Sequence, residues 1–252
     1  MFLKIAAVVS FLLIFGASAS ANECPLDVAE QVEVAAVNGD GILKLADGRR
    51  LRLAAVKLPD VTDELMAEAQ RALSGLVLHR KIDIAFDRRS IDRHGDLIAH
   101  VFLEPAGWLQ SGLVGDGLAR VVSQPEVHAC IAALLRKEGE ARAAKRGLWA
   151  SARYALRTPS GLDDDIGTFQ IVEGTPSTLL SRRDRLYLNF GGDYRTDFTV
   201  TISRRNLKRF VAVGLDPVAI VGKKIRVRGW LSLLNGPEME LSHPEQIELV
   251  AP

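Results

Sequence analysis

The chain has few cysteines, almost no net charge and only one long apolar run. Its two cysteines, Cys24 and Cys130, and its five scattered histidines include no group with the spacing of a zinc site, so neither a zinc protein nor a disulfide-rich scaffold is indicated. The 32 Lys and Arg residues are balanced by 31 Asp and Glu residues. The chain therefore lacks the overall basic field of a nonspecific nucleic-acid binder, and any binding of anions must come from local basic patches.

The apolar run IAAVVSFLLIFG lies near the N-terminus, and its length of about 12 residues is less than the roughly 20 that a membrane span needs. A short cationic segment precedes it and the small residues ASASA follow it. Residues 1–21 are therefore predicted to be a secretory signal peptide cleaved after Ala21; retention as an anchor is the alternative. The mature chain, with no stable membrane span, is expected to be periplasmic or secreted. There, Cys24 and Cys130 are expected to form a disulfide, the alternative being two free thiols.

Hydrophobic periodicity predicts a first domain of strands and helices. Alternating apolar residues and the turns NGDG and DGRR predict strands at 31–37, 41–46, 50–56, 81–86 and 96–104. Apolar residues three and four apart predict helices at 63–78, in the segment 108–121 with its end near Gly117, and at 125–149. The last of these helices is expected to begin at Pro125 and to end at Gly147. This order indicates an α+β fold in which helices pack on a five-stranded barrel.

A second domain is expected after a break in the periodicity. The segment TPSGLDDDIG combines Pro, Gly and three consecutive acids, and it is interpreted as a linker over 158–167. Beyond it, five strand segments are expected, with a helix at 204–214 before the fourth, which is the pattern of an OB-type barrel. The chain thus divides into a signal peptide, a first domain at 22–157, the linker, and a C-terminal OB-like β-domain at 168–252.

Four segments of the first domain occur together in a characteristic order. They are NGDG with LKLADGRRLRLAAVKLPD, then DRHGDLIAHVFL, then GWLQSGLVGDGLARV, and finally EARAAKRGLWA. Together they closely resemble the thermonuclease family, whose type member is staphylococcal nuclease, over about residues 32–150. The resemblance implies an SNase-like OB-fold barrel and a calcium-dependent hydrolase that cleaves phosphodiester bonds of DNA and RNA.

The resemblance also assigns site residues, some of which depart from the family pattern. Asp40 matches a calcium-binding aspartate, Arg52 matches the first phosphate-clamping arginine, and Asp60 stands where the family has the glutamate that acts as general base. Lys57 replaces the second metal aspartate, and Asp96 replaces the second catalytic arginine. An ammonium group has no lone pair for a metal ion, so we expect Lys57 to pair with Asp40 in place of the ion. We expect Asp96 to direct a negative charge toward the phosphate.

These departures predict a catalytically impaired nuclease homologue that acts as a nucleic-acid or protein-binding module. Calcium is implied by the resemblance, but the residues themselves indicate no cofactor. Two alternatives stay open. One is an active, modified endonuclease that uses another divalent cation, with compensation from Arg88, Arg89 or Arg93. The other is an envelope protein with a structural or interaction role.

Two kinds of partner follow from these hypotheses, single-stranded nucleic acid and an envelope protein. The second domain carries the basic segments RRNLKRF and GKKIRVRGW, with Tyr187, Phe190 and Tyr194 nearby. Basic residues beside aromatic residues on an OB-type barrel are typical of single-strand binding. A structural or protein-contact role for this domain is the alternative.

Overall fold

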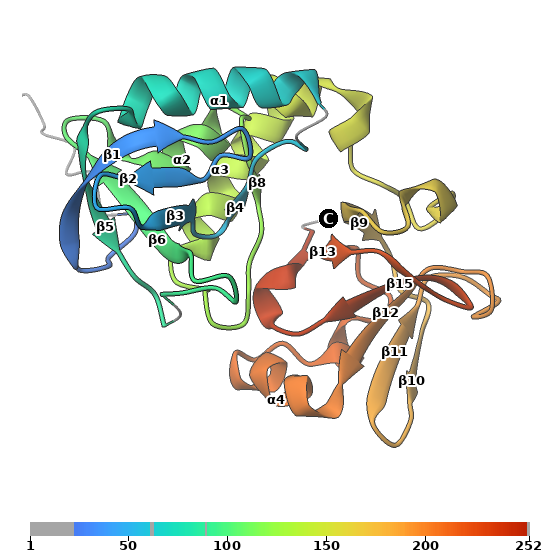
Figure 1. The fold of residues 1–252 in the computed structure, drawn as a ribbon. Coiled ribbons are helices and arrows are strands. Elements are labelled where there is room, and N and C mark those ends of the chain that lie inside the picture. Colours follow the sequence, from blue (N-terminus) through green and yellow to red (C-terminus); the bar gives the residue numbers. More distant parts are fainter. Residues whose placement is uncertain (1–22, 61–62, 89, 251–252) are drawn as a thin grey trace, which may run out of the picture.

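The computed structural model describes residues 23–60, 63–88 and 90–250, which form two domains (Figure 1). The predicted signal peptide, residues 1–21, lies outside the described residues. Within the part of the chain that is described, no helix is long and apolar enough to cross a membrane.

Five strands of the first domain close into the predicted barrel. They are β1 (Glu30–Val37), β2 (Leu43–Leu45), β3 (Arg50–Leu53), β5 (Lys81–Ala85) and β6 (Leu97–Leu103). Neighbouring strands follow the order β3-β2-β1-β5-β6, and a parallel pairing of β3 with β6 closes the ring. Alternate side chains such as Val34, Leu43 and Leu51 are buried in its core, as the period-two pattern of the sequence predicted.

Three helices pack on this barrel. They are α1 (Glu64–Val77), α2 (Leu109–Gly115) and α3 (Ile131–Ala143). The helix α1, which lies along one side of the barrel strands in Figure 1, agrees with its predicted range. Its first turn is capped by Asp63, whose carboxylate accepts a hydrogen bond from the Leu65 backbone N–H at 3.0 Å.

The other two helices are shorter than predicted. The helix α2 ends at Gly115, close to its expected end near Gly117, where a left-handed backbone at φ 72° stops the helical path. The strand β8 (Arg120–Val121) follows it and pairs with β4 (Val56–Lys57). The expected start of α3 at Pro125 is wrong. Cys130 also adopts a left-handed conformation, at φ 65°, so the helix begins only at Ile131.

Eight strands in two sheets form the described part of the second domain. The larger sheet has the order β10-β11-β12-β15-β14 and the smaller one the order β16-β13-β9. The bounds are β9 (Phe169–Gly174), β10 (Thr178–Ser181), β11 (Arg185–Asn189), β12 (Thr199–Ser203), β13 (Ile225–Trp230), β14 (Ser232–Leu234), β15 (Gly236–Leu241) and β16 (Ile247–Leu249). The helix α4 (Arg204–Ala212) follows β12. A second β-domain is therefore confirmed.

The strand count exceeds the five expected by three, because two expected segments each divide between the sheets and β10 was not expected. Between Trp230 and Ser232 the chain leaves the smaller sheet and enters the larger one. Between β15 and β16 the turn Pro244–Gln246 makes the reverse change. The remaining short elements of the chain are the strand β7 (Gly107–Trp108) and 3₁₀ turns at Gly147–Ala150, Ala152–Tyr154, Asp163–Asp165 and Pro217–Ile220.

The segment 158–167, expected as a linker, is attached to the structure on both sides. Leu162 is buried in the core of the second domain. The Asp165 carboxylate accepts hydrogen bonds from the Arg157 guanidinium at 2.7 and 3.2 Å. These contacts fix the path of the chain between the two domains.

A buried ion pair joins the two domains. Arg228 of β13 is only 1% exposed, and its guanidinium lies 2.8 Å from the carboxylate of Glu138 in α3 and 2.6 Å from that of Glu248. It also donates to the Val121 carbonyl at 3.1 Å. A single side chain of the second domain thus contacts both a helix and a strand of the first.

Candidate functional site

A cavity of about 520 Å³ lies where the β1–β2 turn, the end of β3 and the segment after β4 meet. Asp40, Arg52 and Asp60 all line it, so the structure brings together the three residues that the resemblance assigned to metal binding and catalysis. Trp230 of the second domain lines the same cavity. Sequence reasoning missed Trp230 here, because nothing in a strand-end tryptophan indicates which neighbouring domain it will contact.

The expected pair between Lys57 and Asp40 is wrong. The Lys57 ammonium lies 2.7 Å from a carboxylate oxygen of Asp60, three residues along the chain. The turn through Leu58 and Pro59 brings the two charges together locally. Asp40 is exposed, and its carboxylate accepts a hydrogen bond from the Ile42 backbone N–H at 3.2 Å.

Asp60, the candidate general base, is held between two cations. Besides Lys57, the Arg153 guanidinium lies 3.5 Å from its carboxylate. Burial favours the protonated form of Asp60, but the hydrogen bond and charge of Lys57 outweigh it and hold the pKa of this carboxyl below its usual range. A carboxylate with a lowered pKa is a weak proton acceptor, which disfavours general-base catalysis.

Arg52, the candidate phosphate clamp, is also paired within the chain. Its guanidinium lies 3.6 Å from Asp92 and 3.5 Å from Asp96. Asp96 is only 3% exposed and makes a closer pair with Arg50, at 3.0 Å. The expectation that Asp96 directs its charge toward a phosphate is therefore wrong: it is buried against two arginines, where its charge is neutralised.

The arginines considered as replacements lie elsewhere. Neither Arg88 nor Arg93 lines the cavity, and Arg93 donates a hydrogen bond to His94 at 3.0 Å. Arg89 lies outside the described residues. No second arginine joins Arg52 among the described residues that line this cavity.

A second cavity of about 410 Å³ adjoins the first and shares Lys57, Asp60 and Trp230 with it. It lies between the domains, and sequence reasoning did not identify it. Its buried wall is formed by Arg120, whose guanidinium lies 4.8 Å from the ring centre of Tyr154 and 5.2 Å from that of Phe169. Trp230, at 58% exposure, stands at the boundary of the two hollows.

A third cavity, of about 370 Å³, opens on the larger sheet of the second domain. Tyr187, Tyr194 and Arg182 line it, so two of the three aromatic residues expected at a binding surface lie there. Phe190 does not; its ring packs 5.0 Å from Phe198 against the domain core. The helix α4, whose first residue Arg204 contacts the Arg182 carbonyl, exposes Arg204, Arg205, Lys208 and Arg209.

The first domain is thus a closed OB-type barrel with an aspartate, an arginine and a second carboxylate at one cavity. Residues 50–151 match the family model of the staphylococcal nuclease homologues. This match confirms the resemblance over residues 50–150. Domains of this family generally bind nucleic acids and depend on calcium. No curated protein matches the chain at a significant level.

The residues at the cavity do not fit calcium. This ion takes six to eight oxygen ligands, usually anchored by carboxylates. Of the two carboxylates that line the cavity, that of Asp60 is already paired with Lys57 and Arg153, which leaves Asp40. The Lys57 ammonium would repel a divalent cation, so the donor set cannot hold calcium in the manner of the family.

Proposed function

We propose that this protein is an exported member of the staphylococcal nuclease family that lacks calcium-dependent nuclease activity and binds single-stranded nucleic acid. The observation that supports the loss of activity is that both candidate catalytic residues form ion pairs within the chain. Lys57 pairs with the carboxylate of Asp60, and Asp96 pairs with the guanidinium of Arg52. Both partners stand at positions where this sequence departs from the family.

The charge required for phosphoryl transfer is missing for a physical reason. Catalysis of this reaction depends on positive groups that stabilise the charge developing on the phosphate oxygens. One arginine in that role is worth roughly 10³–10⁵ in rate. Arg52 shares its charge with Asp92 and Asp96, and the second arginine is replaced by Asp96 itself. Arg52 therefore offers little uncompensated positive charge to a bound phosphate.

The mature protein should not cleave single-stranded DNA or RNA in calcium, in magnesium or in a chelator. The measurement is the length of labelled oligonucleotides after long incubation at high protein concentration. Metal-dependent cleavage that disappears in both Arg52→Ala and Asp60→Ala would contradict the proposal and establish the active, modified endonuclease. Cleavage that survives both substitutions identifies a contaminating nuclease.

Binding is supported by the surface of the second domain. Tyr187 and Tyr194 offer aromatic faces beside Arg182 at the third cavity. The adjoining helix α4 contacts this region, because the Arg204 guanidinium donates to the Arg182 carbonyl at 3.5 Å. Stacking of bases on aromatic rings beside a basic track is the usual means of binding a single strand without sequence preference.

A fluorescent oligonucleotide should bind the protein at low salt, and the double variant Tyr187→Ala with Tyr194→Ala should weaken binding by about 1–3 kcal/mol for each base that stacks. Fluorescence anisotropy measures the affinity. Arg205→Glu should also weaken binding, whereas Arg136→Glu, an exposed residue of α3, should not. Trp230→Ala should leave the affinity unchanged. A loss of affinity in Trp230→Ala equal to that in the tyrosine variant would place the bound oligonucleotide between the domains. The absence of any binding would favour an envelope protein.

Export is supported by the order of cationic, apolar and small residues in the first 21 positions. It is also supported by the disulfide between Cys24 and Cys130, since disulfides persist in oxidising compartments. Determination of the N-terminal residue of the protein recovered from cells tests this part of the proposal; a chain that keeps residues 1–21 would contradict cleavage after Ala21.

A further inference from the structure

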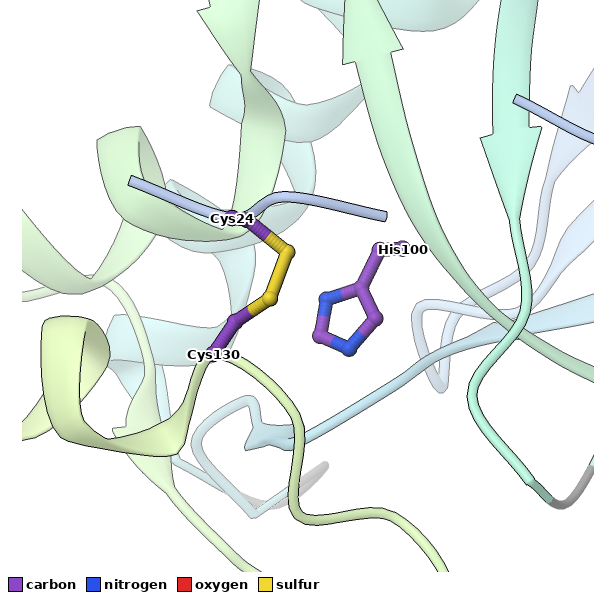
Figure 2. Close-up of side chains that lie close together, drawn as sticks. All are labelled: Cys24, His100 and Cys130. Carbon is purple, nitrogen blue, oxygen red and sulfur yellow. A yellow bond between two sulfur atoms is a disulfide. The ribbon is translucent and has the colours of Figure 1, made fainter. Parts of the chain in front are cut away.

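The disulfide between Cys24 and Cys130 lies beside a buried histidine. The two cysteine Cα atoms are 4.9 Å apart, and His100 comes from β6. Figure 2 shows the imidazole ring next to the disulfide. The two sulfur atoms and a ring nitrogen of His100 all lie within 4.8 Å of one another.

The environment of His100 leaves its ring nitrogens without a hydrogen-bond partner. The side chain is 0% exposed, and neither Nδ1 nor Nε2 has a partner within the described structure. The Trp108 ring packs against it at 5.6 Å. Asp87 is the charged residue that influences it, but that carboxylate accepts backbone hydrogen bonds from His128 and Ala129, each at 2.7 Å. A buried polar group without a partner costs stability and requires an explanation.

We propose that reduction of the disulfide converts this cluster into a binding site for a divalent cation of the Zn²⁺ class. Its protein ligands would be the thiolates of Cys24 and Cys130 and the imidazole of His100. Two sulfurs and one nitrogen form a typical donor set for Zn²⁺, with a fourth position open to water. The ion would give His100 the partner that it lacks.

The disulfide and the metal site exclude each other, because a sulfur must be a thiolate to act as a ligand. A dithiol reductant supplies the two electrons: its thiolate attacks one sulfur, the S–S bond breaks, and the reductant leaves as its own disulfide. Cys24 and Cys130 are then thiols, and binding of the cation releases one proton from each. The redox state of the compartment would thus decide which form is present.

The imidazole is already in the form that a metal requires. Burial lowers the pKa of His100 to about 4, so the ring is neutral near neutral pH and offers a lone pair. Ligand distances to Zn²⁺ of about 2.0–2.3 Å require the sulfurs to move apart after reduction. Cys24 lies in the irregular segment before β1 and not in a helix or a strand.

Sequence spacing could not indicate this site. The two cysteines are 106 residues apart, and His100 lies on a strand between them. The barrel strand, the N-terminal segment and the start of α3 bring the three side chains together only in the folded chain.

The test uses Co²⁺ as a spectroscopic probe for Zn²⁺ on the purified mature protein. One sample stays oxidised; the other is reduced with dithiothreitol, which is then removed under nitrogen. We expect the reduced protein to bind one Co²⁺ per chain with thiolate-to-cobalt charge-transfer absorption, which Zn²⁺ abolishes by displacement. The oxidised protein should show no such absorption.

Variants assign the ligands. Cys24→Ser should abolish the absorption, and His100→Phe should weaken Co²⁺ binding at least about 10- to 100-fold, the loss expected from removing even an outer-shell partner. His128→Gln, near the cluster, is the matched control and should bind as the unchanged protein does. Thermal unfolding of oxidised His100→Phe shows whether this variant keeps its fold.

Three outcomes would overturn the proposal. The first is a reduced, folded protein without charge-transfer absorption. The second is equal Co²⁺ affinity in a folded His100→Phe variant and the unchanged protein. The third is a reduced chain that has lost its near-ultraviolet circular dichroism and does not regain it when Co²⁺ or Zn²⁺ is added.

Discussion

Replacing Glu138 with alanine should lower the free energy of unfolding by about 3–5 kcal/mol. The reason is that Arg228 would remain buried between the domains with only Glu248 as an ionic partner. Burial disfavours the charged guanidinium, but Glu138 and then Glu248 outweigh this and hold the pKa of Arg228 above its usual range, so it stays charged. The Val121 backbone N–H, which donates to Glu138 at 2.8 Å, would also lose its acceptor.

Urea denaturation measures this loss. The matched control is Glu140→Ala, an exposed residue of the same helix, which should change the free energy of unfolding by no more than about 0.5 kcal/mol. The double variant Glu138→Leu with Arg228→Met should be more stable than Glu138→Ala, because it removes the buried charge together with its partner. A double variant as unstable as the single one would show that the ion pair itself stabilises the domain contact.

Acidification from about pH 6.5 to pH 4 should remove up to about 3 kcal/mol of stability through His243 alone. Burial, and then the charges of Arg209 and His128, lower the pKa of His243 to about 4 in the folded protein. The unfolded chain therefore binds a proton at a higher pH than the folded chain does. The contribution is complete above about pH 6.5 and is lost as the pH falls toward the folded value.

The measurement compares stability at several pH values in the unchanged protein and in His243→Gln. His243 joins the domains, since its ring nitrogens lie 2.7 Å from the Ser123 hydroxyl and 2.8 Å from that of Ser242. The variant should be less stable at neutral pH, but its stability should fall less steeply on acidification. His94→Gln, which removes an exposed histidine, should keep the steep profile. Parallel profiles for His243→Gln and the unchanged protein would contradict the assignment.

The barrel could be predicted because its information is local. The alternation in residues 31–56 fixes which side chains are inside, and turn glycines fix where the strands reverse. The gathering of Asp40, Arg52 and Asp60 followed from the resemblance. The ionic partner of each residue did not follow from the resemblance, because ion pairing depends on side-chain distances and burial, and these differ even between residues close together in the sequence.

Two residues illustrate this limit. Lys57 could reach either Asp40 or Asp60 as far as the sequence indicates, and the local turn decides for Asp60. Asp96 lies in a turn that reads as exposed, yet Arg50 and Arg52 cover it. The contribution of Trp230 depends on how two domains dock, and hydrophobic periodicity carries no information about docking.

The position of Trp230 gives the molecule an intrinsic optical probe. The chain has three tryptophans, and the other two, Trp108 and Trp149, are buried. Emission from solvent-exposed indole therefore arises from Trp230, which lines both cavities at the domain boundary. A change in the wavelength or intensity of that emission therefore reports ligand binding or a conformational change at these two cavities, without any added label.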